Sequence, residues 1–261
     1  MERSITVGSL ATHYTEYGTG TPILILHGWG SSADTWKGVQ EQLATHGYRV
    51  LALDLPGFGA TAEPGREWGL SDYTDFVRSF VTQEQLGRFV IVGHSFGGRI
   101  AIEYASQYGE GIAAVVLCGA AGIIRPVSFK RSVFALVAKG GALLAQVPFL
   151  RDAREFARKV LYKVLGERDY YNASPVMRGV MGRVLETPLA PLLPSISQPT
   201  LLAWGDIDEA TPLAHAREAQ ELLPDSTLAI FEGRGHSLQR EVPHDLAERI
   251  ARFLLEKNIQ P

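Results

Sequence analysis

A serine lies between two glycines at the point where a predicted strand gives way to a predicted helix. The stretch 90–101 reads Val-Ile-Val-Gly-His-Ser-Phe-Gly-Gly-Arg-Ile-Ala, with Ser95 between Gly93 and Gly97. A serine on such a tight turn sits at the N-terminus of the helix, where backbone N–H groups stabilise developing negative charge. The five-residue pattern alone is short enough to occur by chance, but its strand-turn-helix context indicates a nucleophile.

Two later loops supply the groups that a serine nucleophile needs. A serine hydroxyl becomes reactive when a base takes its proton and a third group orients that base. Asp206 and Asp208 follow the predicted strand 200–204, and His236 follows the next predicted strand. Because the carboxyl ends of parallel strands meet at one edge of a sheet, we expect the serine, one of these acids and the histidine to converge there.

The elements that would position these groups alternate between strand and helix. The predicted strands are 4–7, 10–17, 22–26, 48–54, 89–93, 114–119, 200–204 and 227–231. Amphipathic helical patterns lie between most of them, and the central strands are almost wholly apolar, as expected of parallel strands buried on both faces. The chain is therefore expected to form an α/β fold: a mostly parallel, doubly wound, eight-stranded sheet with helices on both faces.

One long segment interrupts this alternation. Between about 125 and 194 no strand is predicted, and the helical pattern is broken by glycines and prolines. We interpret 125–194 as a helical cap inserted into a core formed by 1–124 and 195–261. Residues 125–189 include twelve basic and five acidic side chains, a net charge of +7, against −10 for the rest of the chain. This bias indicates either docking on an acidic core or attraction of acidic substrates or a membrane surface.

With these motifs in place, the chain resembles the α/β-hydrolase family over nearly its whole length. Two further motifs carry the resemblance. The sequence His-Gly-Trp-Gly at 27–30 stands where the family has its oxyanion loop, and Asp-Leu-Pro-Gly-Phe-Gly at 54–59 matches the family's turn after the following strand. The order serine, acid, histidine along the chain is also the family's order.

The resemblance implies roles for individual residues. The implied catalytic residues are Ser95 as nucleophile, Asp208 as the orienting acid and His236 as general base, and the implied oxyanion donors are the backbone N–H groups of Trp29 and Phe96. Of the two loop acids, Asp208 matches the family's position, and Asp206 is expected to make local contacts instead. If these roles hold, His236 should lie within hydrogen-bond reach of both the Ser95 hydroxyl and an Asp208 carboxylate oxygen.

Other residues near these motifs are assigned to the substrate pocket or to the core. Strand alternation turns His94 away from the nucleophile, and we assign it to the pocket lining. Four apolar residues of the predicted cap are expected to roof the pocket: Phe129, Phe134, Leu143 and Leu144. His27 is interpreted as a structural turn residue that bonds backbone, and Cys118 as a small core residue.

Composition excludes several other classes of protein. The 261 residues are 20% charged with a net charge of −3, which favours neither a nucleic-acid partner nor a polyanionic one. A single cysteine allows no internal disulfide, and no apolar stretch approaches the length of a membrane span. No metal-ligand spacing and no phosphate-binding glycine motif is found, so we expect no metal and no cofactor. We expect a cytoplasmic protein, without stable membrane insertion, whose partner is a small-molecule acyl substrate; nothing indicates its oligomeric state.

A serine nucleophile favours acyl chemistry. Relatives that act on haloalkanes or epoxides use a carboxylate at this position, because alkylation there must give a displaceable ester. We therefore expect a carboxylesterase that cleaves esters of small to medium acyl groups through an acyl-enzyme on Ser95. A thioesterase, or a carbon–carbon bond hydrolase acting on a vinylogous diketone, would use the same triad. A lyase, or a ligand receptor on a retained hydrolase fold, also remains open.

Overall fold

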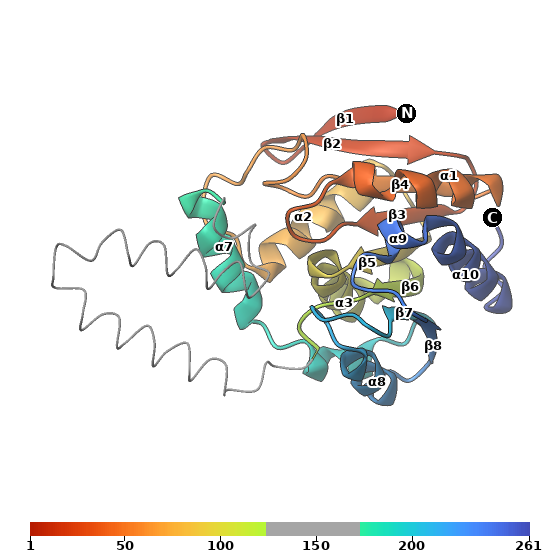
Figure 1. The fold of residues 1–261 in the computed structure, drawn as a ribbon. Coiled ribbons are helices and arrows are strands. Elements are labelled where there is room, and N and C mark those ends of the chain that lie inside the picture. Colours follow the sequence, from red (N-terminus) through yellow and green to blue (C-terminus); the bar gives the residue numbers. More distant parts are fainter. Residues whose placement is uncertain (124–172) are drawn as a thin grey trace, which may run out of the picture.

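The backbone forms one twisted sheet flanked by helices. The computed structural model describes residues 1–123 and 173–261 (Figure 1). In chain order its strands are β1 (Glu2–Val7), β2 (Leu10–Tyr17), β3 (Pro22–Leu26), β4 (Arg49–Leu53), β5 (Phe89–His94), β6 (Ile112–Cys118), β7 (Thr200–Gly205) and β8 (Ser226–Phe231). They form a single sheet in the order β1-β2-β4-β3-β5-β6-β7-β8.

The strand directions match the predicted fold. Strand β2 pairs antiparallel with both β1 and β4, and every other neighbouring pair is parallel. The strand order reverses between β3 and β5: the chain continues to one side of the sheet after β3 and to the other side after β5. Ligands of such sheets bind near this point, at the carboxyl ends of the strands. The prediction of a mostly parallel, doubly wound, eight-stranded α/β sheet is confirmed.

Helices cover both faces of the sheet. One face carries η1 (Ala33–Trp36), α1 (Lys37–Thr45), α9 (Leu238–Glu241) and α10 (Pro243–Glu256); the other carries α2 (Leu70–Gln83), α3 (Phe96–Tyr108) and α8 (Leu213–Leu222). A short turn of 3₁₀ helix, η2 (Gly109–Gly111), links α3 to β6. Alternate residues of β3 enter two separate cores: Leu24 and Leu26 face α2 and α3, and Ile23 and Ile25 face α1 and α10. The central strands are apolar throughout because both of their faces are buried.

The C-terminal end of the predicted cap segment is helical. Helix α7 (Pro175–Glu186) begins at Ser174, whose side chain accepts a hydrogen bond from Met177 N at 3.1 Å, and the 3₁₀ segment η5 (Ala190–Ser195) follows it. Residues 125–172 of the predicted cap lie outside the described residues, so the cap and its boundaries remain predictions. Within the part of the chain that is described, no helix is long and apolar enough to cross a membrane.

Arg99 on α3 joins α7 to the sheet core. Its side chain is buried and donates hydrogen bonds to the carbonyls of Val184, at 2.5 Å, and Thr187, at 2.8 Å, at the C-terminal end of α7. Burial lowers the pKa of Arg99 to about 10, so the guanidinium remains charged at neutral pH. A cation at a helix C-terminus satisfies carbonyls that lack intrahelical partners. The helix that follows Ser95 and the C-terminal end of α7 are thereby joined.

Candidate active site

Ser95 occupies the sharp turn between β5 and α3. Its backbone has φ 50° and ψ −108°, a conformation that residues other than glycine rarely adopt. Such a conformation costs on the order of 1–3 kcal/mol and persists only where the surroundings impose it. Here Ser95 N donates to Cys118 O, and Ala121 N donates to Ser95 O, both at 3.1 Å. These two bonds to the end of β6 and the loop after it hold the turn.

The glycines around Ser95 are required by close packing. A Cβ atom on Gly93 would lie 2.5 Å from Gly97 O, and one on Gly98 would lie 2.6 Å from Ala120 Cβ. A Cβ on Gly97 would collide with the carbonyl oxygen of Leu26 and lie 2.7 Å from His27 O. The first turn of α3 therefore rests directly on backbone at the end of β3, which only glycine permits.

Gly97→Ala should destabilise the protein strongly, because the added methyl group meets backbone that cannot rotate away. We expect the free energy of unfolding to fall by about 3 kcal/mol, the upper range for overpacking a core. Urea unfolding followed by circular dichroism measures the change. Gly182→Ala is the matched control: no other described segment comes within 4 Å of its added Cβ, and alanine favours the helix. Equal stability of the two variants would contradict the packing argument.

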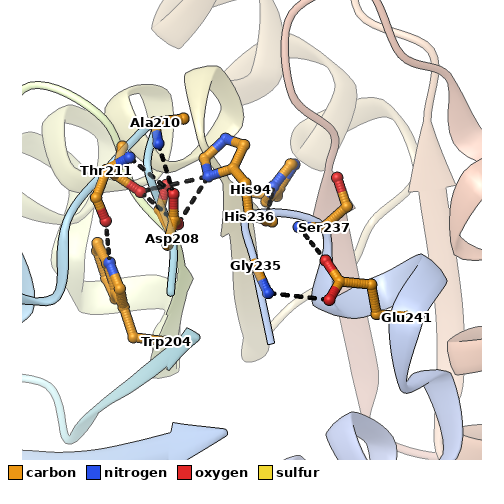
Figure 2. Close-up of polar contacts among 10 residues, drawn as sticks. His94, Trp204, Asp208, Ala210, Thr211, Gly235, His236, Ser237 and Glu241 are labelled. Carbon is orange, nitrogen blue, oxygen red and sulfur yellow. Dashed lines mark hydrogen bonds and ion pairs between the residues drawn. The ribbon is translucent and has the colours of Figure 1, made fainter. Parts of the chain in front are cut away.

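Asp208 is a buried carboxylate in the loop after β7. One oxygen, Oδ1, accepts from Ala210 N at 2.9 Å and Thr211 N at 2.8 Å; the other, Oδ2, bonds the Thr211 hydroxyl and His236 Nδ1, each at 2.8 Å (Figure 2). Burial would raise the pKa of Asp208, but the hydrogen bonds from His236 and Thr211 outweigh it and lower the pKa. The carboxylate therefore stays charged beside the imidazole.

The second loop acid does not join this network. Asp206 is exposed, and within the described residues its carboxylate makes no hydrogen bond and no ion pair. The structure thus brings Asp208, and not Asp206, to the histidine. The local cap or salt bridge expected for Asp206 is not found among the described residues, where its side chain is exposed.

His236 follows β8 and presents its ring to Asp208. Because the carboxylate can only accept, the Nδ1–Oδ2 hydrogen bond places a proton on Nδ1, so Nε2 is the nitrogen that can act as a base in the neutral ring. Gly119 makes room for this pair: a Cβ there would lie 3.2 Å from both Asp208 Oδ2 and His236 Nδ1. The ring of His94, next to Ser95, lies 4.8 Å from the His236 ring between centroids, so the base is beside the serine turn.

The second expected contact of His236 is not formed. Among the described residues, no hydrogen bond joins the Ser95 hydroxyl to His236. Such contacts are often long without substrate and tighten when one binds. The acid–histidine hydrogen bond is thus formed, whereas the serine–histidine hydrogen bond is not.

Two backbone N–H groups near Ser95 have no hydrogen-bond acceptor among the described residues. Phe96 is the first residue of α3, where amides have no intrahelical partner, and Trp29 lies in the turn after β3. In the described part of the chain, neither Trp29 N nor Phe96 N donates a hydrogen bond. The side chains of these two residues pack edge to face, 5.4 Å between centroids. Within the described ranges nothing occupies either amide, so both can bind an anionic oxygen.

The turn that carries Trp29 is held by buried polar groups. His27 bonds Gly28 O through Nδ1 at 2.7 Å and accepts from Leu55 N through Nε2 at 3.1 Å, so its predicted structural role is confirmed. Burial lowers the pKa of His27, which keeps the ring neutral. Asp54, the first residue of the Asp-Leu-Pro-Gly-Phe-Gly turn, accepts from Ala33 N at 2.7 Å and is bonded by His13 at 2.8 Å.

Phe58 is a site residue that the sequence reasoning missed. Its ring packs against the rings of Trp29, at 4.9 Å, and Phe96, at 6.1 Å between centroids, so it contacts the side chains of both candidate oxyanion residues. The sequence contains a signal for it, because Phe58 stands between Gly57 and Gly59 in the Asp-Leu-Pro-Gly-Phe-Gly turn. Both glycines have positive φ in the structure, so the turn is tight. A large side chain on so tight a turn must project from it.

The predicted pocket residues are only partly described. His94 is buried, with 5% of its surface exposed, between the Gly28 turn and His236. Its part in lining a pocket remains a prediction. The predicted roof residues Phe129, Phe134, Leu143 and Leu144 lie outside the described residues. Cys118 is fully buried in the core as predicted, and burial raises the pKa of its thiol to about 12. Within the described ranges, no group of three histidine, cysteine or acidic side chains could hold a metal ion.

The arrangement at this sheet edge is that of a hydrolase. The chain belongs to the alpha/beta hydrolase family, whose sequence model matches residues 23–249. It is 30% identical to the 2-hydroxy-6-oxo-6-(2'-aminophenyl)hexa-2,4-dienoic acid hydrolase of Metapseudomonas resinovorans, over 97% of this chain and 91% of that protein. It is 28% identical to a non-heme haloperoxidase of Rhodococcus erythropolis, over 86% of this chain and 89% of that one.

A solved structure shows the same fold. The crystal structure of a bacterial membrane phospholipase A superposes with a TM-score of 0.78 at 28% identity, over 99% of this chain and 86% of that one. Because the names of these three proteins describe different reactions, the similarity defines the family and not the substrate.

Proposed function

We propose that this hydrolase cleaves carboxylic esters of small to medium acyl groups through an acyl-enzyme on Ser95. The observation that carries the proposal is the hydrogen bond of 2.8 Å between His236 Nδ1 and the buried Asp208 Oδ2, formed beside the strained Ser95 turn. A charged acid that orients a neutral imidazole next to a serine at a helix N-terminus is suited to acyl transfer.

The proposed reaction uses each of these groups in turn. The Ser95 hydroxyl attacks the ester carbonyl while His236 Nε2 takes its proton, and the N–H groups of Trp29 and Phe96 bind the oxyanion. The imidazolium then gives its proton to the departing alcohol, leaving an ester on Ser95. Water, deprotonated by His236, releases the acid and restores the serine. Asp208 remains ionised throughout and stabilises the imidazolium.

A second candidate function is cleavage of a carbon–carbon bond in a vinylogous diketone. The observation that favours it is the 30% identity, over nearly full length, to a hydrolase named for a 2-hydroxy-6-oxo-hexadienoic acid. The same serine, acid and histidine would serve, and so they would for a thioester. The similarity to a phospholipase, an enzyme of ester bonds by its name, favours the ester.

A substrate panel separates these functions. The wild type and Ser95→Ala are assayed with p-nitrophenyl esters of increasing acyl length, acyl-CoA thioesters and vinylogous diketones. We expect the highest kcat/KM with short and medium esters, and loss of that turnover in the variant. Fastest turnover of a diketone would assign carbon–carbon cleavage instead. A folded wild type that binds these compounds without turning any over would be a receptor.

A further inference from the structure

The backbone around His236 is held by side chains outside the triad. The carbonyl of His236 accepts a hydrogen bond from His94 Nε2 at 2.9 Å. The amides on either side of it, Gly235 N and Ser237 N, donate to the two carboxylate oxygens of Glu241 at 2.9 and 3.1 Å (Figure 2). With the ring bonded to Asp208, the loop is therefore fixed at its ring, at its carbonyl and at both flanking amides.

His94 fills the space between two loops of the site. It is the last residue of β5, and its ring lies against that of His236, with Trp36 edge-on behind it at 6.3 Å between centroids. On the other side, its Nδ1 lies 2.7 Å from where a Cβ on Gly28 would stand. The ring thus separates the turn that precedes Trp29 from the loop that carries His236.

His94 is held in one protonation state. Its Nε2 must carry a proton to donate to the His236 carbonyl, and within the described residues its buried Nδ1 has no partner. Burial, and then the neighbouring His236, lower the pKa of His94 to about 3. The ring therefore keeps its Nε2–H donor at working pH and adds no positive charge beside the imidazolium that forms during the reaction.

We propose that His94 and Glu241 are positioning residues that set the place of the general base: His94 holds the carbonyl of His236 and Glu241 holds its flanking amides. This inference rests on the proposed function, because it assumes that His236 acts on Ser95. The His236 ring is bonded by Asp208, lies 3.3 Å from the Thr211 hydroxyl and packs against the His94 ring; Glu241 bonds only the backbone. Because no bond to Ser95 holds the ring, its position depends on these contacts.

Two substitutions of His94 separate positioning from packing. His94→Leu keeps much of the bulk and removes the donor, whereas the amide of His94→Gln can place a donor near the position of Nε2. With a p-nitrophenyl ester, we expect His94→Leu to lower kcat by about 10- to 100-fold, the scale of a small misplacement of a catalytic group, with KM nearly unchanged. His94→Gln should recover most of that loss.

The pH profile distinguishes this role from a merely structural one. The Asp208 carboxylate stabilises the charged form of the His236 ring, so a loop that drifts from Asp208 loses part of that stabilisation. The acidic limb of kcat/KM should therefore move to lower pH in His94→Leu and return in His94→Gln. Glu241 is exposed, and Glu241→Ala should lower kcat and move the acidic limb to lower pH, each by less than His94→Leu does.

The outcomes are distinct from failure of the proposed function. Circular dichroism and Tm establish which variants are folded. If His94→Leu does not fold, the result with Glu241→Ala tests the positioning role. Folded variants with wild-type kcat and limb, while Ser95→Ala is inactive, would overturn the positioning role alone. Equal losses in His94→Leu and His94→Gln with an unmoved limb would also overturn it, in favour of packing. Full activity in Ser95→Ala would overturn both this inference and the proposed function.

Discussion

Ser95→Ala and His236→Ala should each lower kcat for ester hydrolysis by about 10⁴- to 10⁶-fold, and the double variant should lose little more. The two residues perform one step, in which the serine attacks only as the histidine takes its proton. Once either residue is removed, the other can no longer contribute to this step. Residual turnover would come from binding and from the two free amides near Ser95.

Kinetics on all three variants, with Ser79→Ala and His46→Ala as controls, measure this non-additivity. Both control residues lie away from the candidate site, with surface contacts: Ser79 bonds the carbonyl of Asp75 within α2, and His46 bonds Glu248. Their variants should keep kcat within about twofold. Losses in the double variant that multiply those of the single variants would mean that the two residues act independently, contrary to the proposed mechanism.

Asp208→Asn should lower kcat by about 10³- to 10⁴-fold without unfolding the protein. The amide can keep an oxygen on Ala210 N and Thr211 N, so the loop should survive. It then turns an NH₂ group toward His236 Nδ1, which favours the tautomer with the proton on Nε2. That tautomer cannot take a proton from the serine.

Asp206→Asn is the matched control, since Asp206 lies in the same loop, two residues away, and is exposed. It should keep kcat within about twofold. Steady-state kinetics with far-UV circular dichroism on both variants test the acid assignment. A large loss of kcat in Asp206→Asn together with a mild one in Asp208→Asn would show that Asp206, and not Asp208, orients His236.

The strained serine turn and the buried polar groups at this sheet edge are stabilised by hydrogen bonds. Ser95 at positive φ and charged Asp208 are each costly alone, and each is held by several hydrogen bonds. Neutral His27 is bonded through both ring nitrogens, and neutral His94 through Nε2. Buried polar groups carry little penalty when they are fully bonded and a large one when they are not. The loops at the carboxyl edge therefore stabilise one another, with the site at their centre.

Much of this protein follows from local patterns in its sequence. Apolar runs such as Ile23–Leu26 specify strands buried on both faces, and the glycines around Ser95 specify a tight strand-to-helix turn. These features depend on residues close together in the chain, so they can be read without knowing the fold. The order of serine, acid and histidine, with each after a strand, then places all three at one sheet edge.

Contacts between distant segments were decided only by the tertiary structure. Asp206 and Asp208 both follow β7, and only the resemblance to the family favoured Asp208; packing leaves Asp206 exposed and brings Asp208 to a histidine 28 residues away. Strand alternation predicts that the His94 side chain points away from Ser95. It does not predict that His94 bonds the carbonyl of His236, 142 positions later. Arg99 is likewise an ordinary helical residue until α7 lies against it. Local sequence specifies backbone geometry, whereas the partner of a side chain depends on which loops the packed sheet brings together.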